Sequence, residues 1–376
     1  MNVLVTGANG FLGKNLIENL KAVRDGKSKV FEKTDINILS YDINNSEEDL
    51  KEFCKQADFV YHLAGVNRPK DKSEFYSGNS DLTLKLLNLL SQAKKPPVMI
   101  SSSTWAETDN DYGTSKRMAE NYVFEYSKTN EVKCFVYRFT NLFGKWARPS
   151  YNSVVATFCN NVAQNLPITV NDGSAVLKLN YIDDVVYELI GAFFGKETRL
   201  ENGFCSVEKV YTVTVGKLAE IIKSFKDLSR FPNCQDGLTK ALYSTYLSYL
   251  PQNDLEKKPL THSDERGSFT EIFKSFSGEQ VSLNIVKKGK IKGNHWHNTK
   301  VERFTIIKGV GVIRLRKLGD DKVLEYKNKL GEILSVDIPA GMTHNMENLG
   351  EEDLEVLIWC NEPLNPLNPD TFYEEV

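Results

Sequence analysis

Apolar residues in the first half of the chain switch between two periods. A short apolar run over Asn2–Val5 stops at a glycine. Apolar residues then recur at helical spacing, at Phe11, Leu12, Leu16, Ile17 and Leu20. Further apolar runs of strand length lie at 37–41, 59–63, 97–100 and 135–138. This alternation of strands and helices predicts an α/β domain built on a doubly wound parallel sheet.

The pattern changes after Thr261. Short segments of alternating apolar and polar residues, separated by glycine turns, lie at 281–286, 303–307, 311–315, 333–338 and 354–359. Regularly spaced short strands predict an all-β sandwich or barrel. Between the halves the pattern is interrupted at Pro232, Gly237, Pro251 and Pro259. We therefore predict one domain over 1–240, a linker over 241–260 and a second domain over 261–376.

Composition excludes several classes of protein. The length of 376 residues suggests more than one domain, and the net charge of −3 gives no reason to expect nucleic acid or a membrane surface as partner. No run of 18 apolar residues is present, and the N-terminal apolar run is too short for a signal peptide. The six scattered cysteines form no C-x-x-C pair, which is typical of free thiols in a reducing cytosol. We expect a cytoplasmic protein.

Glycines 7, 10 and 13 lie between the first predicted strand and the first predicted helix. In that context glycine permits a tight turn and lets backbone N–H groups approach a pyrophosphate at the helix N-terminus. The alternative is an ordinary glycine-rich turn. The further alternating strands and helices favour a Rossmann-type dinucleotide site.

Tyr112 and Lys116 are four residues apart, so on a helix they share one face. A lysine ammonium beside a tyrosine hydroxyl lowers the pKa of the tyrosine, which can then exchange a proton with an alcohol or ketone oxygen. A surface tyrosine is the alternative. The pair follows a strand that ends in Ser101-Ser102-Ser103, which favours catalysis.

Over roughly 1–237 the chain resembles the extended short-chain dehydrogenase/reductase family. The motifs that carry the resemblance are T-G-A-N-G-F-L-G, H-L-A-G, I-S-S-S, Y-G-T-S-K, R-F-T-N-L-F-G and N-Y-I-D-D-V. The resemblance implies that Tyr112 is the acid/base and that Lys116 holds the nicotinamide ribose. It also implies that Ser103 hydrogen-bonds the substrate oxygen, with Ser102 as the alternative if the register differs by one residue.

The same resemblance implies which residues bind the ligands. The residues expected to contact the cofactor are Gly7, Gly10, Phe11, Leu12, Gly13, Asp42, Leu63, Ala64, Tyr112 and Lys116. Its sugar-nucleotide contacts are Asn141, Arg148 and Asn152. A guanidinium suits a diphosphate, although Arg148 could equally form a surface salt bridge.

The choice between NADH and NADPH depends on Asp42, at the end of the second predicted strand. A carboxylate there receives the adenosine ribose hydroxyls and repels a 2′-phosphate. Asp42 and Asn9 therefore favour NADH, whereas members of the family use NADPH, and Lys14 and Arg68 could lie nearby. The alternative is that Asp42 is an ordinary loop residue.

The second half contains a candidate metal site. His295 and His297 share one strand face, Glu302 follows, and His344 lies further along the chain. Imidazoles with a carboxylate form a site for zinc, iron or manganese, of which zinc is expected. The chain has five histidines in all, and three fall in this set, so unrelated placement is the weaker explanation.

This half resembles the cupin family, through G-K-I-K-G-N-H-W-H-N-T-K-V-E-R-F-T-I-I-K-G and P-A-G-M-T-H-N-M-E-N. The upstream D-E-R-G-S-F-T-E resembles the substrate-holding segment of nucleotide-sugar 3,5-epimerase cupins. That likeness implies that Arg266 grips a phosphate and Glu271 a neighbouring polar group. A structural salt bridge is the alternative for both.

The whole chain resembles the bifunctional capsule-biosynthesis enzymes of the UDP-N-acetyl-L-fucosamine pathway. The resemblance implies a homodimer that acts on a UDP-2-acetamido-2,6-dideoxy-4-hexulose. The cupin inverts C3, and the reductase then reduces the C4 ketone with NAD(P)H to UDP-2-acetamido-2,6-dideoxy-L-talose. Two alternatives stay open: a monofunctional 4-keto-sugar reductase with a structural metal, and a non-catalytic sensor, for which Tyr112 and Lys116 would be unnecessary.

Overall fold

The computed structural model describes residues 1–227, 230–367 and 369–376. The chain forms two compact units. The first comprises 1–223 and 241–250, and the second comprises 224–240 and 251–376. Residues 241–250, expected in the linker, therefore pack with the first unit and include much of helix α9 (Gly237–Leu247).

A parallel sheet of five strands, in the order β2-β1-β3-β4-β5, forms the centre of the first unit. The strands are β1 (Asn2–Thr6), β2 (Asn37–Tyr41), β3 (Phe59–His62), β4 (Val98–Ser103) and β5 (Cys134–Phe139). All five match apolar runs in the sequence. The strand order reverses between β1 and β3, and open parallel sheets bind ligands at the carboxyl ends of the strands at such a point.

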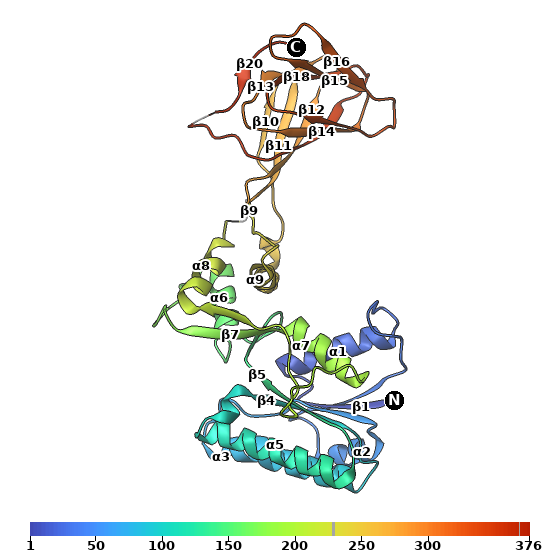
Figure 1. The fold of residues 1–376 in the computed structure, drawn as a ribbon, viewed down its shortest axis with the longest axis vertical. Coiled ribbons are helices and arrows are strands. Elements are labelled where there is room, and N and C mark those ends of the chain that lie inside the picture. Colours follow the sequence, from blue (N-terminus) through green and yellow to red (C-terminus); the bar gives the residue numbers. More distant parts are fainter. Residues whose placement is uncertain (228–229, 368) are drawn as a thin grey trace. The chain divides into compact units, whose positions relative to one another are not determined.

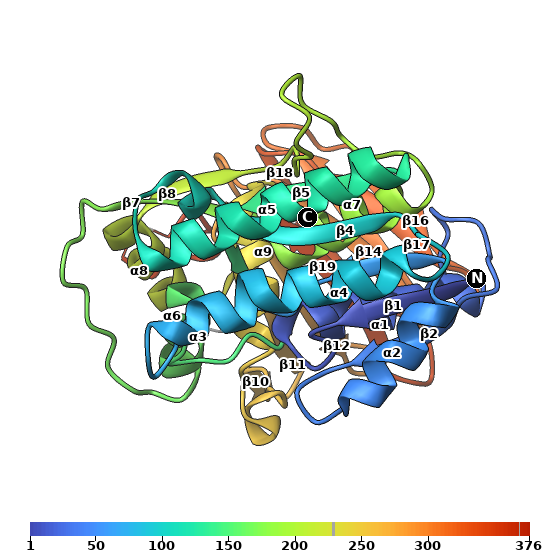
Figure 2. The same cartoon turned by 90° about the horizontal axis from the view of Figure 1, so that it is seen from below.

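Helices cover both faces of this sheet, as Figure 1 shows. One face packs against α1 (Phe11–Arg24) and α7 (Ile182–Phe193). The other packs against α2 (Glu47–Gln56), α4 (Leu82–Ser91) and α5 (Asp111–Asn130), and Figure 2 shows α4 and α5 side by side. Two separate apolar cores result, one on each side of the strands. The predicted doubly wound arrangement is confirmed.

Shorter elements lie in the described part of the chain outside the central sheet and the barrel. The helical ones are α3 (Ser73–Phe75), a π-helical turn (Tyr76–Asp81), 3₁₀ turns (Thr104–Glu107 and Gln252–Asp254), α6 (Val154–Ala163) and α8 (Val215–Ser224). A small sheet contains β6 (Asn141–Phe143), β7 (Val176–Tyr181) and β8 (Tyr211–Thr214). This sheet begins with Asn141, the first of the predicted sugar-nucleotide residues.

The second unit is an all-β barrel of two sheets. One has the order β10-β11-β12-β19-β14-β17, with β9 paired to β11, and the other has the order β16-β15-β18-β13-β20. The strands of the first sheet are β9 (Arg230–Phe231), β10 (Thr261–Asp264), β11 (Gly267–Ser275), β12 (Gln280–Val286), β14 (Glu302–Lys308), β17 (Leu334–Ile338) and β19 (Leu354–Cys360). Those of the second are β13 (Ile291–Trp296), β15 (Gly311–Lys317), β16 (Val323–Lys327), β18 (Met342–Asn348) and β20 (Phe372–Tyr373).

Strand alternation explains the barrel core. Along β12 and β19 every second residue is buried, as expected for strands with one face toward the core. The core draws Val286, Phe304 and Ile306 from the first sheet and Ile313, Leu315 and Met346 from the second. The predicted fold class, an α/β doubly wound Rossmann-type domain followed by an all-β barrel, is therefore confirmed.

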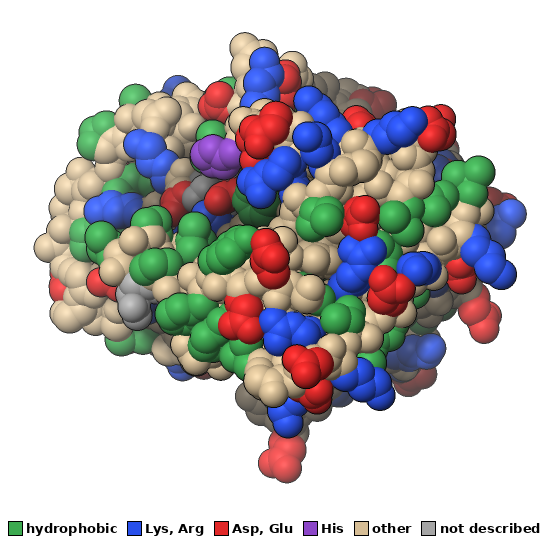
Figure 3. All heavy atoms as spheres, turned by 90° about the horizontal axis from the view of Figure 1, so that it is seen from above, with side chains coloured by type: hydrophobic (Ala, Val, Ile, Leu, Met, Phe, Trp, Pro, Cys, Tyr) green, Lys and Arg blue, Asp and Glu red, His purple; other side chains and the backbone are tan. Residues whose placement is uncertain are grey.

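Two surface properties bear on the expected partners. No helix in the described ranges is long and apolar enough to cross a membrane. On the face drawn in Figure 3, basic and acidic side chains are interspersed, as the small net charge leads one to expect.

The barrel core makes a direct prediction about β14. Ile306 is fully buried, whereas its neighbour Ile307 is 41% exposed. Ile306→Ala should therefore lower the free energy of unfolding of the second unit by about 2–5 kcal/mol, through lost burial and a residual cavity. Ile307→Ala should change it by no more than about 0.5 kcal/mol. Urea unfolding of the full chain followed by tryptophan fluorescence checks this, and equal effects of the two variants would contradict the assigned strand faces.

Candidate active site and metal centre

The glycine turn lies at the carboxyl end of β1. Gly7 has a φ of +69°, which favours glycine, and a Cβ there would lie 2.7 Å from the backbone nitrogen of Ala64. A Cβ on Gly13 would lie 2.2 Å from the carbonyl oxygen of Gly7. The turn is therefore packed tightly between the start of α1, which includes Phe11 and Leu12, and the segment that follows β3. Close backbone packing of this kind is what a pyrophosphate cradle requires.

Lys116 reaches this same edge of the sheet from α5. Its side chain is buried, and its ammonium donates to the carbonyl oxygen of Ser101 at 3.1 Å. A Cβ on Gly65 would lie 3.0 Å from the Lys116 Nζ, so the ammonium lies against the segment that Leu63 and Ala64 begin. Burial lowers the pKa of Lys116 to about 8, and the nearby carboxylate of Glu120 opposes that shift.

Tyr112 is placed by the first turn of α5. Asn110 caps this helix by accepting the backbone N–H of Gly113 at 2.8 Å. A Cβ on Gly113 would lie 2.3 Å from the carbonyl oxygen of Trp105, so glycine lets the helix start approach the 3₁₀ turn after β4. That approach brings Tyr112 to Ser103, the last residue of β4, whose hydroxyl interacts with the tyrosine.

The structure distinguishes the two candidate serines. Ser102 is buried, and its hydroxyl donates to the Glu120 carboxylate at 2.5 Å. The same carboxylate accepts two hydrogen bonds from Arg138. Ser102 therefore belongs to a buried network, whereas the half-buried Ser103 is the serine that interacts with Tyr112.

One expectation about the tyrosine is wrong. The i, i+4 spacing suggested that Lys116 lowers the pKa of Tyr112. Burial instead raises the pKa of Tyr112, and the interaction that partly opposes this shift comes from Ser103. Tyr112 and Lys116 share one face of the helix, but the Lys116 ammonium donates its hydrogen bond to the backbone of Ser101 instead of to the tyrosine.

Asp42 follows β2 directly and is tied to the glycine turn. Its carboxylate accepts the backbone N–H of Asn9 at 2.7 Å and the backbone N–H of Ile43 at 2.8 Å. The acidic group therefore lies beside the turn, as a residue that receives ribose hydroxyls must. Arg68, considered as a nearby cation, instead has its guanidinium 6.0 Å from the ring centre of Tyr151.

The predicted sugar-nucleotide residues lie on one exposed segment. Asn141 donates to the carbonyl oxygen of Lys178 at 3.2 Å, and Asn152 is exposed. The Arg148 guanidinium lies 5.4 Å from the Tyr151 ring centre, so this tyrosine has both Arg68 and Arg148 as neighbours. The alternative for Arg148 was a surface salt bridge. Among the described residues, Arg148 forms no such bridge.

The four predicted metal ligands converge in the second unit. One donor atom from each of His295, His297, Glu302 and His344 lies within 4.8 Å of the others. His295 on β13 is paired with His344 on β18, and Glu302 begins β14 in the other sheet. Asn294 has a φ of +59°, and the register shifts between Gly293 and His295, so a local irregularity directs the end of β13 toward the cluster.

The chemistry of these groups fits a metal ion. The Nε2 atoms of His297 and His344 and one oxygen of Glu302 are buried and have no hydrogen-bond partner among the described residues. That oxygen lies 3.4 Å from the His297 Nε2 and 3.1 Å from the His344 Nε2. Buried polar atoms without partners are costly, whereas three nitrogens and one oxygen suit a divalent transition metal.

The protonation states fit as well. Burial lowers the pKa of His295 to about 4, and the neighbouring His344 adds to the effect, so this imidazole is neutral at pH 7. Burial alone would raise the pKa of Glu302, but its interactions with His297 and His344 outweigh burial and hold that pKa far below its usual range. Neutral imidazole and ionised carboxylate are the forms that bind metals.

The second nitrogen of each buried histidine is held by backbone. The Nδ1 of His344 faces the carbonyl oxygen of Met342 at 3.2 Å, and the Nδ1 of His297 is hydrogen-bonded to the carbonyl oxygen of Asp370. The Asp370 carboxylate also accepts the backbone N–H groups of Asn298 at 2.9 Å and Thr299 at 2.8 Å. These contacts fix the imidazoles with Nε2 toward the cluster.

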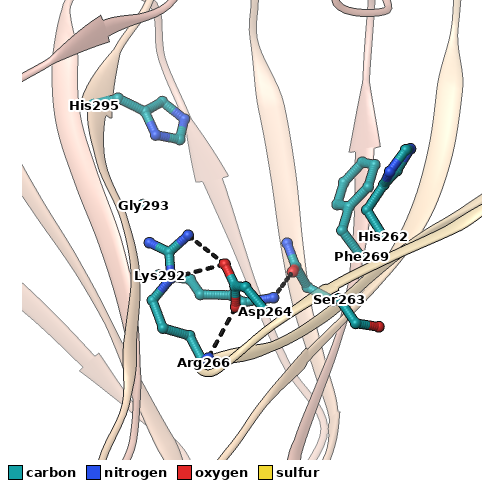
Figure 4. Close-up of a pocket in the computed structure, with 9 residues that line it drawn as sticks. His262, Ser263, Asp264, Arg266, Phe269, Lys292, Gly293 and His295 are labelled. Carbon is teal, nitrogen blue, oxygen red and sulfur yellow. Dashed lines mark hydrogen bonds and ion pairs between the residues drawn. The ribbon is translucent and has the colours of Figure 1, made fainter.

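A cavity of about 330 Å³ lies beside the cluster and includes His295 in its wall. Figure 4 shows Arg266 in the same wall, with its guanidinium turned to Asp264. That ion pair has a distance of 2.6 Å. Glu271 is not among the lining residues, and it pairs with Lys274 at 2.7 Å. Of the two predicted substrate residues in this unit, the structure brings only Arg266 to the cavity.

Sequence reasoning missed two supporting residues. Asn79 lies in the π-helical turn, where its side chain bonds both backbone groups of Val66 and the hydroxyl of Ser115. It therefore ties the segment after β3 to α5. Asp370 lies 73 residues after His297, and no local pattern connects the two.

Two family models match the chain, one in each half. Residues 3–190 match the NAD dependent epimerase/dehydratase family, and residues 262–372 match the polysaccharide biosynthesis C-terminal domain. The chain belongs to the NAD dependent epimerase/dehydratase family. Membership implies a nicotinamide cofactor for the glycine turn described above.

Two relatives of this epimerase/dehydratase chain extend over its whole length. One is the UDP-2-acetamido-2,6-beta-L-arabino-hexul-4-ose reductase of Pseudomonas aeruginosa, 39% identical over 99% of this chain and 98% of its own. The other is the crystal structure of the capsular polysaccharide assembling protein CapF from Staphylococcus aureus. It is 43% identical, with a TM-score of 0.90 and complete coverage of both chains. UDP-glucuronic acid 4-epimerase from Bacillus cereus shares the fold at 16% identity, with a TM-score of 0.53, over 68% of this chain and 100% of its own.

The serine assignment generates a prediction. Ser103→Ala should lower ketone reduction by about 10-fold or more, because it removes a hydrogen bond beside Tyr112. It should cost less stability than Ser102→Ala, since the half-buried Ser103 hydroxyl caps an exposed 3₁₀ turn by accepting the backbone N–H of Trp105, which water can replace. Ser102→Ala should lower the free energy of unfolding by about 1–3 kcal/mol, because it removes a partner from the buried Glu120 carboxylate. Steady-state kinetics and thermal unfolding of both variants check this, and the reverse pattern would reverse the assignment.

The metal centre generates a second prediction. Asp370→Ala should weaken zinc binding by about 10- to 100-fold, because the loop beside His297 loses the carboxylate that organises it. Competition for the metal with a chromogenic chelator measures the affinity. Asp320→Ala, at a turn within the same unit, is the matched control and should leave it unchanged. Equal affinity of Asp370→Ala and wild type would show that the loop needs no such support.

Proposed function

We propose that this protein is a bifunctional UDP-sugar enzyme, in which the barrel epimerises C3 of a UDP-2-acetamido-2,6-dideoxy-4-hexulose and the Rossmann-type unit reduces the C4 ketone. The product is then UDP-2-acetamido-2,6-dideoxy-L-talose. The observation that carries the proposal is the presence of two complete constellations on one chain: Ser103, Tyr112 and Lys116 at the edge of a dinucleotide turn, and four metal donors beside a cavity. The relative from Pseudomonas aeruginosa is named as a reductase of a UDP-linked 4-hexulose, and the relative from Staphylococcus aureus as a capsular polysaccharide assembling protein, and both names support the proposal.

In the barrel, the ketone at C4 makes the C3 hydrogen acidic. A divalent metal, with zinc expected, would act as a Lewis acid on the substrate oxygen when bound by His295, His297, Glu302 and His344. The half-exposed His295 forms part of the cavity wall, whereas His344 is fully buried, so substrate approaches the cluster from the His295 side. Return of a proton to the opposite face of C3 inverts that centre.

In the Rossmann-type unit, reduction ends the acidity of C3 and fixes the configuration. The nicotinamide, when bound, supplies hydride to C4. Tyr112 donates a proton to the C4 oxygen, and Ser103 hydrogen-bonds the same oxygen. Burial raises the pKa of Tyr112, which keeps the hydroxyl protonated for this donation. Lys116 places a cation next to the segment where the nicotinamide ribose is held.

The nucleotide and the assembly follow from the same proposal. Asp42 at the glycine turn favours NADH through its carboxylate, while the resemblance to the reductase family favours NADPH. Arg148 and Arg68, whose guanidinium groups both lie near the ring of Tyr151, offer two cations to the diphosphate of the substrate. A homodimer in the cytoplasm is the expected working form.

One observation favours a second candidate, a monofunctional reductase whose metal is structural. His297 is buried and tied to Asp370, so a bound metal would also anchor the C-terminal segment. His295 argues for chemistry instead, because a purely structural site has no need of a ligand in a cavity wall.

Isotope exchange distinguishes the two candidates. In deuterium oxide without nicotinamide, wild type should exchange the C3 hydrogen of the UDP-4-hexulose, as followed by NMR. Tyr112→Phe should exchange at the wild-type rate but reduce the ketone about 10²- to 10⁴-fold more slowly, because it lacks the proton donor. His295→Ala should lose exchange.

The control is Asp320→Ala, because this side chain is exposed and lies outside both the cluster and the cavity. Normal exchange in His295→Ala would favour the structural metal. Absence of both exchange and reduction in wild type, with either nicotinamide, would overturn the proposed function.

A further inference from the structure

A lysine lies in the cavity beside the metal cluster and has no role in the steps above. Lys292 is in β13, three residues before His295, and its side chain is only 9% exposed. Both residues line the same cavity (Figure 4). Ammonium groups are rarely buried to this extent unless they are paired.

The hydrogen bonds of Lys292 are incomplete. Its Nζ donates to the carbonyl oxygen of Ser268 at 3.0 Å and to the side-chain oxygen of Asn284 at 3.1 Å. Both acceptors are neutral, and an ammonium has three N–H donors. Within the described residues no carboxylate lies within salt-bridge distance of this nitrogen. One donor and the positive charge are therefore left for a group in the cavity.

The neighbouring charges do not neutralise it. Asp264 is the carboxylate whose charge acts on Lys292, and it accepts hydrogen bonds from two guanidinium nitrogens of Arg266. Arg266 itself repels the lysine. Burial and this repulsion lower the pKa of Lys292, while Asp264 opposes the shift. The cavity wall thus contains two cations. Arg266 is paired with a carboxylate, and Lys292 has no ion-pair partner among the described residues.

We propose that Lys292 is a catalytic residue of the C3 epimerisation, whose ammonium hydrogen-bonds the substrate oxygen that becomes negative when C3 loses its proton. This inference rests on the proposed function. A general base in the cavity accepts the C3 proton, the electron pair of the C3–H bond forms the C3–C4 double bond, and the carbonyl pair moves onto the C4 oxygen. A proton from solvent-exchangeable groups then returns to C3 and the carbonyl re-forms, so no oxidant or reductant is consumed.

Burial makes such a cation effective. Because Lys292 is largely shielded from water, its fixed positive charge interacts more strongly with a developing negative charge than an exposed ammonium would. The charge is already in position, held by Ser268 and Asn284, so little reorganisation is needed during the reaction. The cost of burying it is expected to appear as lower stability of the protein.

Because burying the charge of Lys292 is expected to lower stability, the melting temperature distinguishes a catalytic role of this lysine from a structural one. Lys292→Met keeps the length of the side chain and removes the charge. It should lower the rate of C3 deuterium exchange at saturating substrate by about 10²- to 10³-fold, the size typical of losing one oxyanion donor. The melting temperature should equal or exceed that of wild type, because an uncompensated buried charge has been removed.

Lys290→Met is the matched control, since Lys290 is exposed, lies outside the cavity and is only two residues away. It should exchange at the wild-type rate. Zinc content by elemental analysis should stay the same in both variants, because Lys292 contributes none of the four donors. All exchange measurements omit the nicotinamide, so that the reductase does not contribute.

Each other outcome overturns the inference. Wild-type exchange in Lys292→Met excludes a catalytic role. A lower melting temperature or loss of zinc assigns the lysine to structure, and a higher KM with unchanged exchange at saturation assigns it to ground-state binding, for example of the diphosphate. Absence of exchange in the wild type is a different result, since it removes the proposed function itself.

Discussion

The arrangement of the second unit is explained by one constraint: polar atoms that are buried without hydrogen-bond partners destabilise a fold. Two imidazole nitrogens and one carboxylate oxygen from His297, His344 and Glu302 lie together in the interior with no hydrogen bond among the described residues. A barrel of this size could have filled that position with apolar side chains, as it does elsewhere in its core. Instead β13, β18 and β14, which belong to two different sheets, each direct a donor to one point. This convergence of donors in the interior is the arrangement that a metal ion would require.

The first unit is organised around a close backbone contact. Because Gly113 has no side chain, the first turn of α5 can approach the carbonyl of Trp105, and the tyrosine and serine meet at the end of β4. Gly7 and Ala64 make a similar close approach at the neighbouring strands. Both contacts lie at the carboxyl edge of the sheet. Chemistry and cofactor share that edge because parallel strands all end there.

Much of the fold followed from periodicity. The runs at 59–63 and 354–359 became β3 and β19, because the side chains of β3 are all buried and those of β19 alternate, as their patterns require. Strand β18 was not predicted from periodicity, and β13 was expected only through the shared strand face of His295 and His297, since the buried positions of both strands include His344, Asn345 and Lys292. Polar residues were buried there because they serve the cluster and cavity, and periodicity does not detect burial of that kind.

The candidate site was predictable only where residues are close in sequence. The four metal donors could be named because two short motifs contain them, and the Tyr112 and Lys116 pair could be named from helical spacing. The direction in which the Lys116 ammonium points could not be predicted, because it depends on the carbonyl oxygen of Ser101 in strand β4. The separate roles of Ser102 and Ser103 likewise depend on Glu120, which lies 18 residues beyond Ser102. The packing of α5 against β4 brings this carboxylate to Ser102.

The tie between His297 and Asp370 also sets an order of events during synthesis. A ribosome makes the chain from its N-terminus, so all four donors emerge before the carbonyl that orients one of them. Until Asp370 has emerged, the Nδ1 of His297 lacks the carbonyl that holds it in the finished fold, so the geometry of the four donors is completed only when the C-terminal segment has been made.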